Sequence, residues 1–200
     1  MPALSKLTLE PGKSYHILNR GNNRRTIFDV DRDYLRFLDL LEKYILPIAK
    51  IQAYALLSNH FHLAVAIREE SELEEFYLEK PARIIRRFGH LQNAYAKYFI
   101  HRNDLVSGLF ERSFERYLID SDEYCKKLIV YLHMNPVNHG VSSSISSYEW
   151  TSYPGLIGDS QSKILDKEGV YRLFGGRQSF IFAHNGWDEL PAFPSEIGIS

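Results

Sequence analysis

Two apolar runs separated by a two-residue polar turn most restrict how this chain can fold. The runs are Lys50–Leu57 and His60–Ile67, and Ser58-Asn59 lies between them. Apolar runs joined by so short a polar segment are typical of a β-hairpin, because a two-residue turn returns the chain antiparallel to itself. We therefore expect an antiparallel sheet in which these runs are the second and third strands.

Two histidines flank a phenylalanine at the start of the second run. Side chains alternate between the two faces of a strand, so His60 and His62 share one face, about 6 to 7 Å apart along the strand, while Phe61 points into a core. Neutral imidazole is a common metal ligand, and two imidazoles on one face can hold one divalent cation. An isolated H-x-H is more often an ordinary polar face, and later parts of the chain favour the metal interpretation here.

Hydrophobic periodicity divides the rest of the chain into strands and helices. We expect further strands at residues 14–20 and 109–119, and helices at residues 34–45, 81–101, 124–134 and 167–174. Asn135-Pro136 should end the helix at 124–134, since proline disfavours helical backbone in the residue before it. The order of the elements before residue 135 is β-α-β-β-α-β-α.

That order is typical of the split βαβ arrangement of ferredoxin-like sheets. We predict an α+β fold with an antiparallel sheet and with helices packed on one face, which leaves His60 and His62 exposed on the other face. We expect one functional domain at residues 1–153 and a C-terminal extension of mixed or irregular structure at residues 154–200.

Composition limits the classes of protein to consider. With 200 residues, 44% hydrophobic and 24% charged, the chain is an ordinary globular one. Its single cysteine excludes an internal disulfide and a multi-cysteine zinc site, and it fits a reducing cytoplasm. A net charge of −1 gives no support for nucleic-acid binding, so any such case rests on where the charges lie. No apolar run reaches signal-peptide or membrane-spanning length, and we expect a cytoplasmic protein with no membrane partner.

Tyr131 and Asn135 are four residues apart in an expected helix and therefore share a face. A phenol and an amide oxygen facing His60 and His62 would supply one nucleophile and three metal ligands. The cation would polarise a phosphoryl oxygen, and the phenol would attack to give a covalent phosphotyrosine. The alternative is that Tyr131 is a core aromatic residue and that Asn135 caps the end of the helix. Y-x-x-x-N alone does not distinguish the two.

A set of motifs in fixed order is more specific than any one of them. The motifs are S-Y-H-I-L-N-R-G-N-N-R-R-T-I-F, A-Y-A-L-L-S-N-H-F-H-L, S-G-L-F-E-R-S-F-E-R, Y-L-H-M-N-P-V-N-H-G and Y-E-W-T-S-Y. Together they resemble the REP-associated tyrosine transposases, which belong to the HUH single-strand transposase superfamily. The similarity extends from about Tyr15 to Tyr153.

The resemblance implies an HUH-type endonuclease and strand transferase that acts on single-stranded DNA with hairpin-forming, REP-like ends. It implies Mg²⁺ or Mn²⁺ as the cofactor and a 5′-phosphotyrosine intermediate. Carried over by position, His60 and His62 are metal ligands, Asn135 is a further ligand and Tyr131 is the nucleophile. The oligomeric state could be a monomer or a homodimer, since relatives of both kinds occur.

Two features depart from or complicate this pattern. Family members often have proline where Ser58 stands, a change that we expect to be tolerated. Tyr95, in N-A-Y-A-K-Y-F, is an alternative nucleophile. We prefer Tyr131 because Asn135 accompanies it at the family's spacing.

DNA binding must come from local clusters of basic and amide side chains, because arginine and lysine at phosphates supply most non-specific affinity. The candidates are Arg20, Asn22, Asn23, Arg24, Arg25, Arg83, Arg86, Arg87, Lys97, Arg112 and Arg116. Asn22 and Asn23, with the arginines beside them, would form the loop that reads a hairpin. For most of these residues taken singly, a solvated helix face is the simpler interpretation.

Two alternatives to an enzyme remain. The first is a domesticated protein that binds DNA hairpins without cleaving them, which the near-neutral charge and Ser58 slightly favour. The second is a metal-binding fold with no role in DNA, which leaves the basic helix and the ordered motifs unexplained. Retention of all four proposed site residues favours the enzyme.

Overall fold

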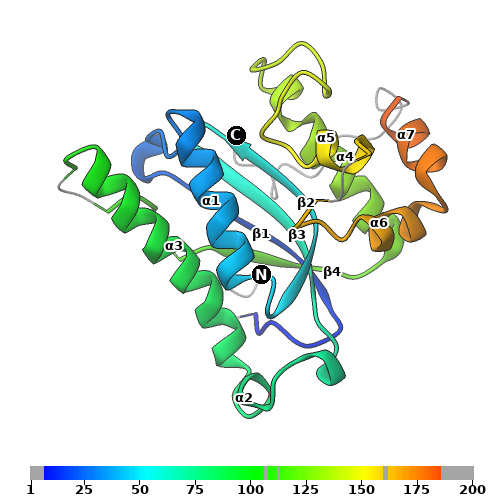
Figure 1. The fold of residues 1–200 in the computed structure, drawn as a ribbon, viewed down its shortest axis with the longest axis horizontal. Coiled ribbons are helices and arrows are strands. Elements are labelled where there is room, and N and C mark those ends of the chain that lie inside the picture. Colours follow the sequence, from blue (N-terminus) through cyan, green and yellow to red (C-terminus); the bar gives the residue numbers. More distant parts are fainter. Residues whose placement is uncertain (1–6, 106–107, 112, 160–161, 186–200) are drawn as a thin grey trace.

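The computed structural model describes residues 7–105, 108–111, 113–159 and 162–185, and a four-stranded sheet lies at its centre (Figure 1). The strands are β1 (Ser14–Arg20), β2 (Ala49–Leu57), β3 (His60–Ile67) and β4 (Glu115–Ile119). They lie in the order β2-β3-β1-β4, and each neighbouring pair is antiparallel. This is the ferredoxin-like arrangement, and it confirms the predicted α+β fold and the hairpin.

The helices surround this sheet in two layers. They are α1 (Asp31–Tyr44), α2 (Glu75–Leu78), α3 (Ala82–Arg102), α4 (Asp122–Asn138), α5 (Tyr153–Ile157), α6 (Lys167–Phe174) and α7 (Arg177–Asn185), with 3₁₀ turns η2 (Asn22–Arg24) and η3 (Glu70–Glu72). None of the helices in the described ranges is long and apolar enough to cross a membrane.

The first layer, α1 and α3, packs on the face of the sheet that carries Phe61 (Figure 1). Aromatic rings fill this interface: Phe37 of α1 lies 4.9 Å from Phe61 and 5.1 Å from Tyr95 of α3, measured between ring centroids. Phe61 is fully buried, as its place in the strand alternation predicts. This face therefore forms the main apolar core.

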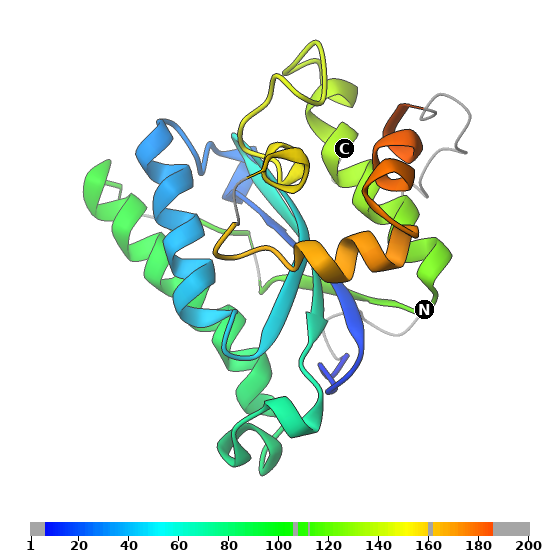
Figure 2. The same cartoon turned by 45° about the vertical axis from the view of Figure 1, so that its right-hand side comes forward.

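The second layer covers the face on which the histidines lie, which corrects part of the prediction. The prediction of helices on one face only was wrong. Helices α1 and α3 lie on one face, but α4 packs over β2 and β3 on the other face, with α5, α6 and α7 against it (Figure 2). Small side chains on this face, among them Ala53, Ala55 and Ala64, allow α4 to approach closely. Consequently His60 is 4% exposed and His62 is 0% exposed, instead of lying open to solvent.

Two element boundaries also differ from the prediction. The helix that Asn135-Pro136 was expected to end continues to Asn138, because Pro136 lies in its last turn, where its missing N–H affects only the bond to the Leu132 carbonyl. Asn135 thereby stays within regular helix, and its carbonyl accepts a hydrogen bond from the His139 N–H. The fourth strand begins at Glu115 instead of 109, and Phe110 forms only a single bridge with Gly21.

The described part of the C-terminal extension contains the helices α5, α6 and α7, joined by non-helical segments. Helix α6 occupies the predicted range 167–174, and Leu156, Val170, Phe174 and Phe180 belong to the same buried cluster as the inner side of α4. Residues 186–200 lie outside the described part of the chain. The extension therefore packs against α4 as a continuation of the second layer.

Candidate functional site

Three buried histidines lie together on one face of the sheet, and we call them the site histidines. His60 and His62 come from β3, and His16 comes from the neighbouring strand β1. Nε2 of His16 lies 2.9 Å from Nδ1 of His62, and the two rings are stacked with centroids 5.1 Å apart. The sequence placed His16 in a strand, but only the register between β1 and β3 reveals that it meets His62.

Helix α4 brings Tyr131 and Asn135 to the site histidines. Oδ1 of Asn135 lies 3.4 Å from Nε2 of His60, and the ring of Tyr131 lies edge-on to that of His62 with centroids 6.4 Å apart. Asn135 is buried and Tyr131 is half-buried. The four residues named from the sequence for metal binding and nucleophilic attack are thus neighbours, although about 70 residues separate the strand from the helix.

Burial keeps the site histidines in the neutral form that binds metal. Loss of solvation lowers the pKa of His16 to about 3 and that of His60 to about 4, and it lowers the pKa of His62 well below its usual value. For Tyr131, burial raises the pKa of the phenol, whereas a hydrogen bond with Asn135 lowers it.

The donor set fits a divalent cation. His62 Nε2 is buried and has no hydrogen-bond partner within the described ranges, and His60 Nε2 faces an amide oxygen. No group of three or more His, Cys, Asp and Glu side chains among the described residues is arranged to hold a metal ion. A cation here would therefore be held by two imidazoles and the amide oxygen of Asn135, with the remaining positions open to phosphate oxygens.

A cleft of about 230 Å³ opens beside His60. Arg24 and His139 contribute to its wall, and the His139 ring lies 5.5 Å from that of His60. The polar loop after β1 supplies Arg24, which has a left-handed backbone with φ of 58°. Gly21 permits this loop, since a Cβ there would lie 2.0 Å from the Arg25 carbonyl oxygen. The cleft thus places one exposed arginine beside the site histidines.

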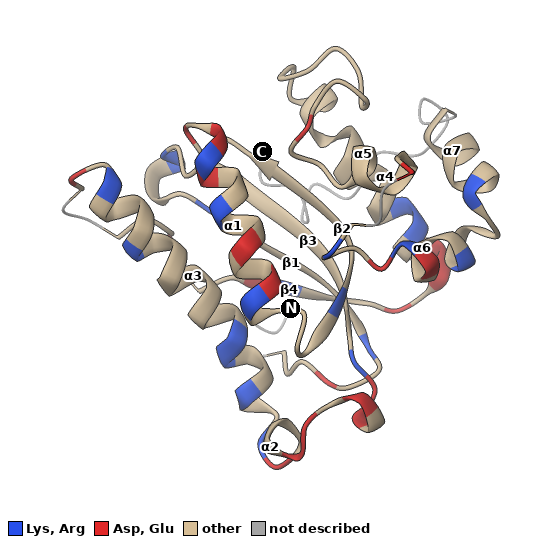
Figure 3. Cartoon of the chain, viewed as in Figure 1, with Lys and Arg blue, Asp and Glu red and all other residues tan. Residues whose placement is uncertain are grey.

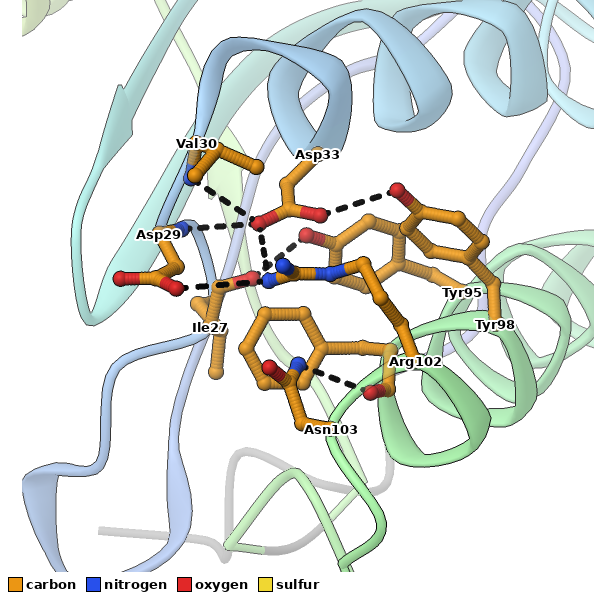
Figure 4. Close-up of polar contacts among 9 residues, drawn as sticks. Ile27, Asp29, Val30, Asp33, Tyr95, Tyr98, Arg102 and Asn103 are labelled. Atoms are coloured by element: carbon orange, nitrogen blue, oxygen red, sulfur yellow. Dashed lines mark hydrogen bonds and ion pairs between the residues drawn. The ribbon is translucent and has the colours of Figure 1, made fainter.

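The alternative nucleophile, Tyr95, lies on the opposite face of the sheet. It is fully buried, and its ring contacts those of Phe28 and Phe37. Its hydroxyl donates to the Ile27 carbonyl (Figure 4). Burial raises the pKa of this phenol, and the nearby carboxylate of Asp33 raises it further. The sheet therefore lies between Tyr95 and the site histidines.

Asp33 organises the polar contacts around Tyr95. Its Oδ2 accepts the backbone N–H groups of Asp29 and Val30 and lies 2.8 Å from the Arg102 guanidinium, while Oδ1 accepts the Tyr98 hydroxyl proton (Figure 4). These bonds cap the start of α1 and join it to the end of α3. The cluster is a structural element of the first layer.

The basic candidates for DNA binding divide between the two faces. Arg20 pairs opposite His60 in the sheet and binds Glu111 at 2.7 Å, and the turn η2 carries Asn22, Asn23 and Arg24 close to the same end of β1. Arg25 follows directly. These residues lie near the site histidines and the cleft.

The candidates on α3 lie on the other face of the sheet, and Figure 3 shows basic positions along this helix with acidic residues concentrated around η3 and α2. Arg86 and Lys97 are exposed. Arg87 binds the carbonyls of Lys43 and Tyr44 at the end of α1, and Arg83 pairs with Glu79. Two of these four side chains therefore serve the fold.

Two further candidates lie on or before β4. Arg116 is only 5% exposed, donates to the Leu7 carbonyl and packs over Phe114, so it belongs to the first layer's core. Arg112 lies outside the described residues.

A separate pair of buried histidines, His133 and His184, joins α4 to α7, and we call them the paired histidines. Nδ1 of His133 lies 2.7 Å from Nε2 of His184, Nε2 of His133 lies 2.7 Å from the Ser152 hydroxyl, and Nδ1 of His184 donates to the Phe180 carbonyl. The backbone N–H of Tyr54 on β2 donates to Ser152 Oγ at 2.9 Å. Every ring nitrogen of this pair thus has a partner.

A scan of the sequence against protein-family models and a search of the curated proteins found no match. A search of the solved structures found a REP-associated tyrosine transposase bound to a REP hairpin, with a TM-score of 0.57 and 16% sequence identity. The match covers 82% of this chain and 90% of that chain. At this identity the likeness shows the fold alone, and it confirms the resemblance drawn from the motifs at that level: the chain has the fold of a REP-associated tyrosine transposase.

Proposed function

We propose that this protein is a metal-dependent endonuclease and strand transferase for single-stranded DNA, acting at hairpin ends through Tyr131. The observation that carries the proposal is the meeting of Tyr131 and Asn135 on α4 with His60 and His62 on β3. The fold supports it, because a solved protein with this fold is a tyrosine transposase bound to a REP hairpin. We place the reaction in the cytoplasm.

In the proposed reaction the Tyr131 hydroxyl gives its proton to a water molecule, and its oxygen attacks the scissile phosphorus. The phosphorus–O3′ bond breaks, the 3′-oxygen takes up a proton, and the 5′-phosphate stays joined to the tyrosine. Strand transfer is the reverse attack by a 3′-hydroxyl. Burial raises the pKa of the Tyr131 phenol, and the hydrogen bond with Asn135 partly offsets that rise. A bound Mg²⁺ or Mn²⁺ would supply polarisation of a phosphoryl oxygen, with His60, His62 and Asn135 as its protein ligands.

A denaturing-gel assay tests this function. Protein, Mn²⁺ or Mg²⁺ and single-stranded hairpin oligonucleotides labelled at either end should give a covalent adduct on the 3′-side fragment. Tyr131→Phe should abolish the adduct. Tyr95→Phe is the matched control, since it removes one hydroxyl from a buried tyrosine on the other face and should leave the adduct intact per folded molecule.

Two outcomes would reject the assignment in different ways. An adduct that persists in Tyr131→Phe would remove the nucleophile from this residue. A retained gel shift without cleavage, across many hairpins and both metals, would favour the second candidate, a hairpin-binding protein without nuclease activity. The near-neutral net charge of −1 and Ser58 are the observations that keep this second candidate in view.

A further inference from the structure

We propose that Asn59 and His16 are positioning residues that set the tautomers of His60 and His62, so that both imidazoles present an unprotonated Nε2 to the proposed cation. This inference rests on the proposed function for the identity of the ligand. The hydrogen-bond geometry around each ring carries it, and neither Asn59 nor His16 is among the ligands predicted from the sequence.

Asn59 determines which nitrogen of His60 carries the proton. Nδ1 of His60 lies 2.6 Å from Oδ1 of Asn59, an oxygen that can only accept. A neutral imidazole has one N–H, so that proton must be on Nδ1 and Nε2 must carry the lone pair. Nε2 then faces Oδ1 of Asn135 at 3.4 Å, and two acceptors confront each other. A cation between them satisfies both.

The turn that carries Asn59 is fixed by the polar loop after β1. The Asn59 carbonyl accepts the N–H of Gly21 at 2.8 Å, and the Ser58 carbonyl accepts those of Ile27 and Phe28 at 2.7 and 2.9 Å. The backbone of the turn from which the Asn59 side chain extends is therefore held independently of any ligand. Such support is how outer-shell residues orient metal ligands.

His16 plays the corresponding part for His62. Its Nε2 lies 2.9 Å from His62 Nδ1, so one of the two nitrogens donates to the other. If His62 donates, its buried Nε2 is a free lone pair, and His16 carries its own proton on Nδ1, which then is the buried donor without a partner in the described part of the chain. If His16 donates, Nε2–H of His62 is a buried donor without a partner in the described part of the chain. Only the first arrangement makes His62 a ligand.

The test reads tautomers directly from ring nitrogen shifts in ¹⁵N-histidine spectra of the full chain without added metal, and Mn²⁺ affinity from calorimetry. In the wild-type protein His60 should be the Nδ1–H tautomer. Asn59→Leu should release it to the Nε2–H tautomer and weaken Mn²⁺ binding about 10- to 100-fold. Asn59→Asp keeps an accepting oxygen and should retain the wild-type tautomer.

A second pair of variants tests His16. His16→Gln offers an accepting oxygen near the position of Nε2 and should keep His62 in the Nδ1–H form with Mn²⁺ binding close to wild type. His16→Leu removes the acceptor and should weaken Mn²⁺ binding by a similar 10- to 100-fold. The tautomers of His133 and His184 are an internal reference for folding, because they should be the same in every variant.

Each outcome decides the proposal. A wild-type His60 that carries its proton on Nε2 overturns it, since the Asn135 amide would then be an ordinary hydrogen-bond partner. Variants that lose metal affinity with unchanged tautomers also overturn it. If the wild-type tautomers are as expected but neither Mn²⁺ binding nor cleavage occurs, the proposed function fails instead.

Discussion

The site histidines and the paired histidines are alike in residue type and burial but differ in how their nitrogens are satisfied. His133 and His184 form a closed chain of hydrogen bonds that ends at the Ser152 hydroxyl and the Phe180 carbonyl. In the other group, His16 Nδ1 and His62 Nε2 are buried without a partner in the described ranges. The two clusters lie on opposite sides of the same helix, α4.

The difference teaches which buried polar groups point to a ligand. Burial lowers the pKa values of both clusters, so a shifted pKa does not separate them. Native proteins pair nearly all buried polar atoms, and an unpaired one calls for an explanation. The paired histidines are satisfied within the fold, whereas the unpaired nitrogen of His62 would be satisfied by the cation that we propose.

The largest effect should come from breaking the site cluster. His62→Phe removes one proposed ligand while keeping a ring of similar size in the pocket. We expect adduct formation per folded molecule to fall more than 100-fold, which is about 3 kcal/mol in activation free energy. The thermal midpoint should fall modestly, because buried His16 Nε2 loses its hydrogen bond with His62. Gel quantification of the adduct and a melting curve measure the two parts. A His62→Phe protein with full activity would contradict the proposed site.

The corresponding change in the paired histidines should act on stability instead. His133→Leu leaves His184 Nε2 without a partner, whereas the Ser152 hydroxyl keeps its hydrogen bonds with the Tyr54 backbone. One unsatisfied buried group should lower the free energy of unfolding in urea by about 1–3 kcal/mol. Adduct formed per folded molecule should change much less than in His62→Phe, and a larger loss would place His133 in the site.

Acid should lower the free energy of unfolding through the protonation of His184. The pKa of His184 is about 4 in the folded chain, against 6.5 for an ordinary histidine. The unfolded chain therefore binds the proton first as pH falls, so stability is complete above about 6.5 and is lost between about 6.5 and 4. His184 alone accounts for about 3 kcal/mol.

Urea unfolding at several pH values checks this expectation. The contribution of His184 to the free energy of unfolding should be nearly constant between about pH 7 and 8, and it should decline at lower pH. A stability that stays constant down to pH 4.5 would contradict the burial of a neutral His184.

The smallest expected effect tests whether DNA binds on the face of the site histidines. Arg24 lines the cleft beside His60, whereas Arg86 is exposed on α3 across the sheet. If Arg24 contacts one phosphate, Arg24→Ala should reduce the slope of log affinity against log salt by about 1. Arg86→Ala is the matched control and should leave it unchanged. Equal effects of the two variants would mean that DNA does not favour the site face.

The parts of the fold that depend on local patterning could be predicted. The bounds of β1 and β3, the hairpin at Ser58-Asn59 and the burial of Phe61 all follow from alternation and turn chemistry. The spacing of Tyr131 and Asn135 also correctly placed both on one face of a helix. These features are set by residues close together in the chain.

The parts of the fold and of the candidate site that depend on tertiary packing could not be predicted from the sequence. His16 joins the site only through the register of β1 against β3, and the second helical layer buries histidines that alternation alone left exposed. The sequence predicts Arg116 as a DNA-binding residue on a strand, but the Arg116 side chain is buried and donates to the Leu7 carbonyl. The charge and hydrophobic periodicity of one segment do not show which of its faces another helix or strand will cover.

The two-sided use of α4 has an evolutionary consequence. One side of the helix carries Tyr131 and Asn135, while the other is anchored through His133 to α7 and to Phe180. A mutation in the C-terminal helices can therefore shift the proposed nucleophile without touching DNA. Phe180 is also a fully buried core residue, so folding alone would keep it under selection in a lineage that had given up cleavage. The first positions to relax in such a lineage would be Tyr131 and Asn135.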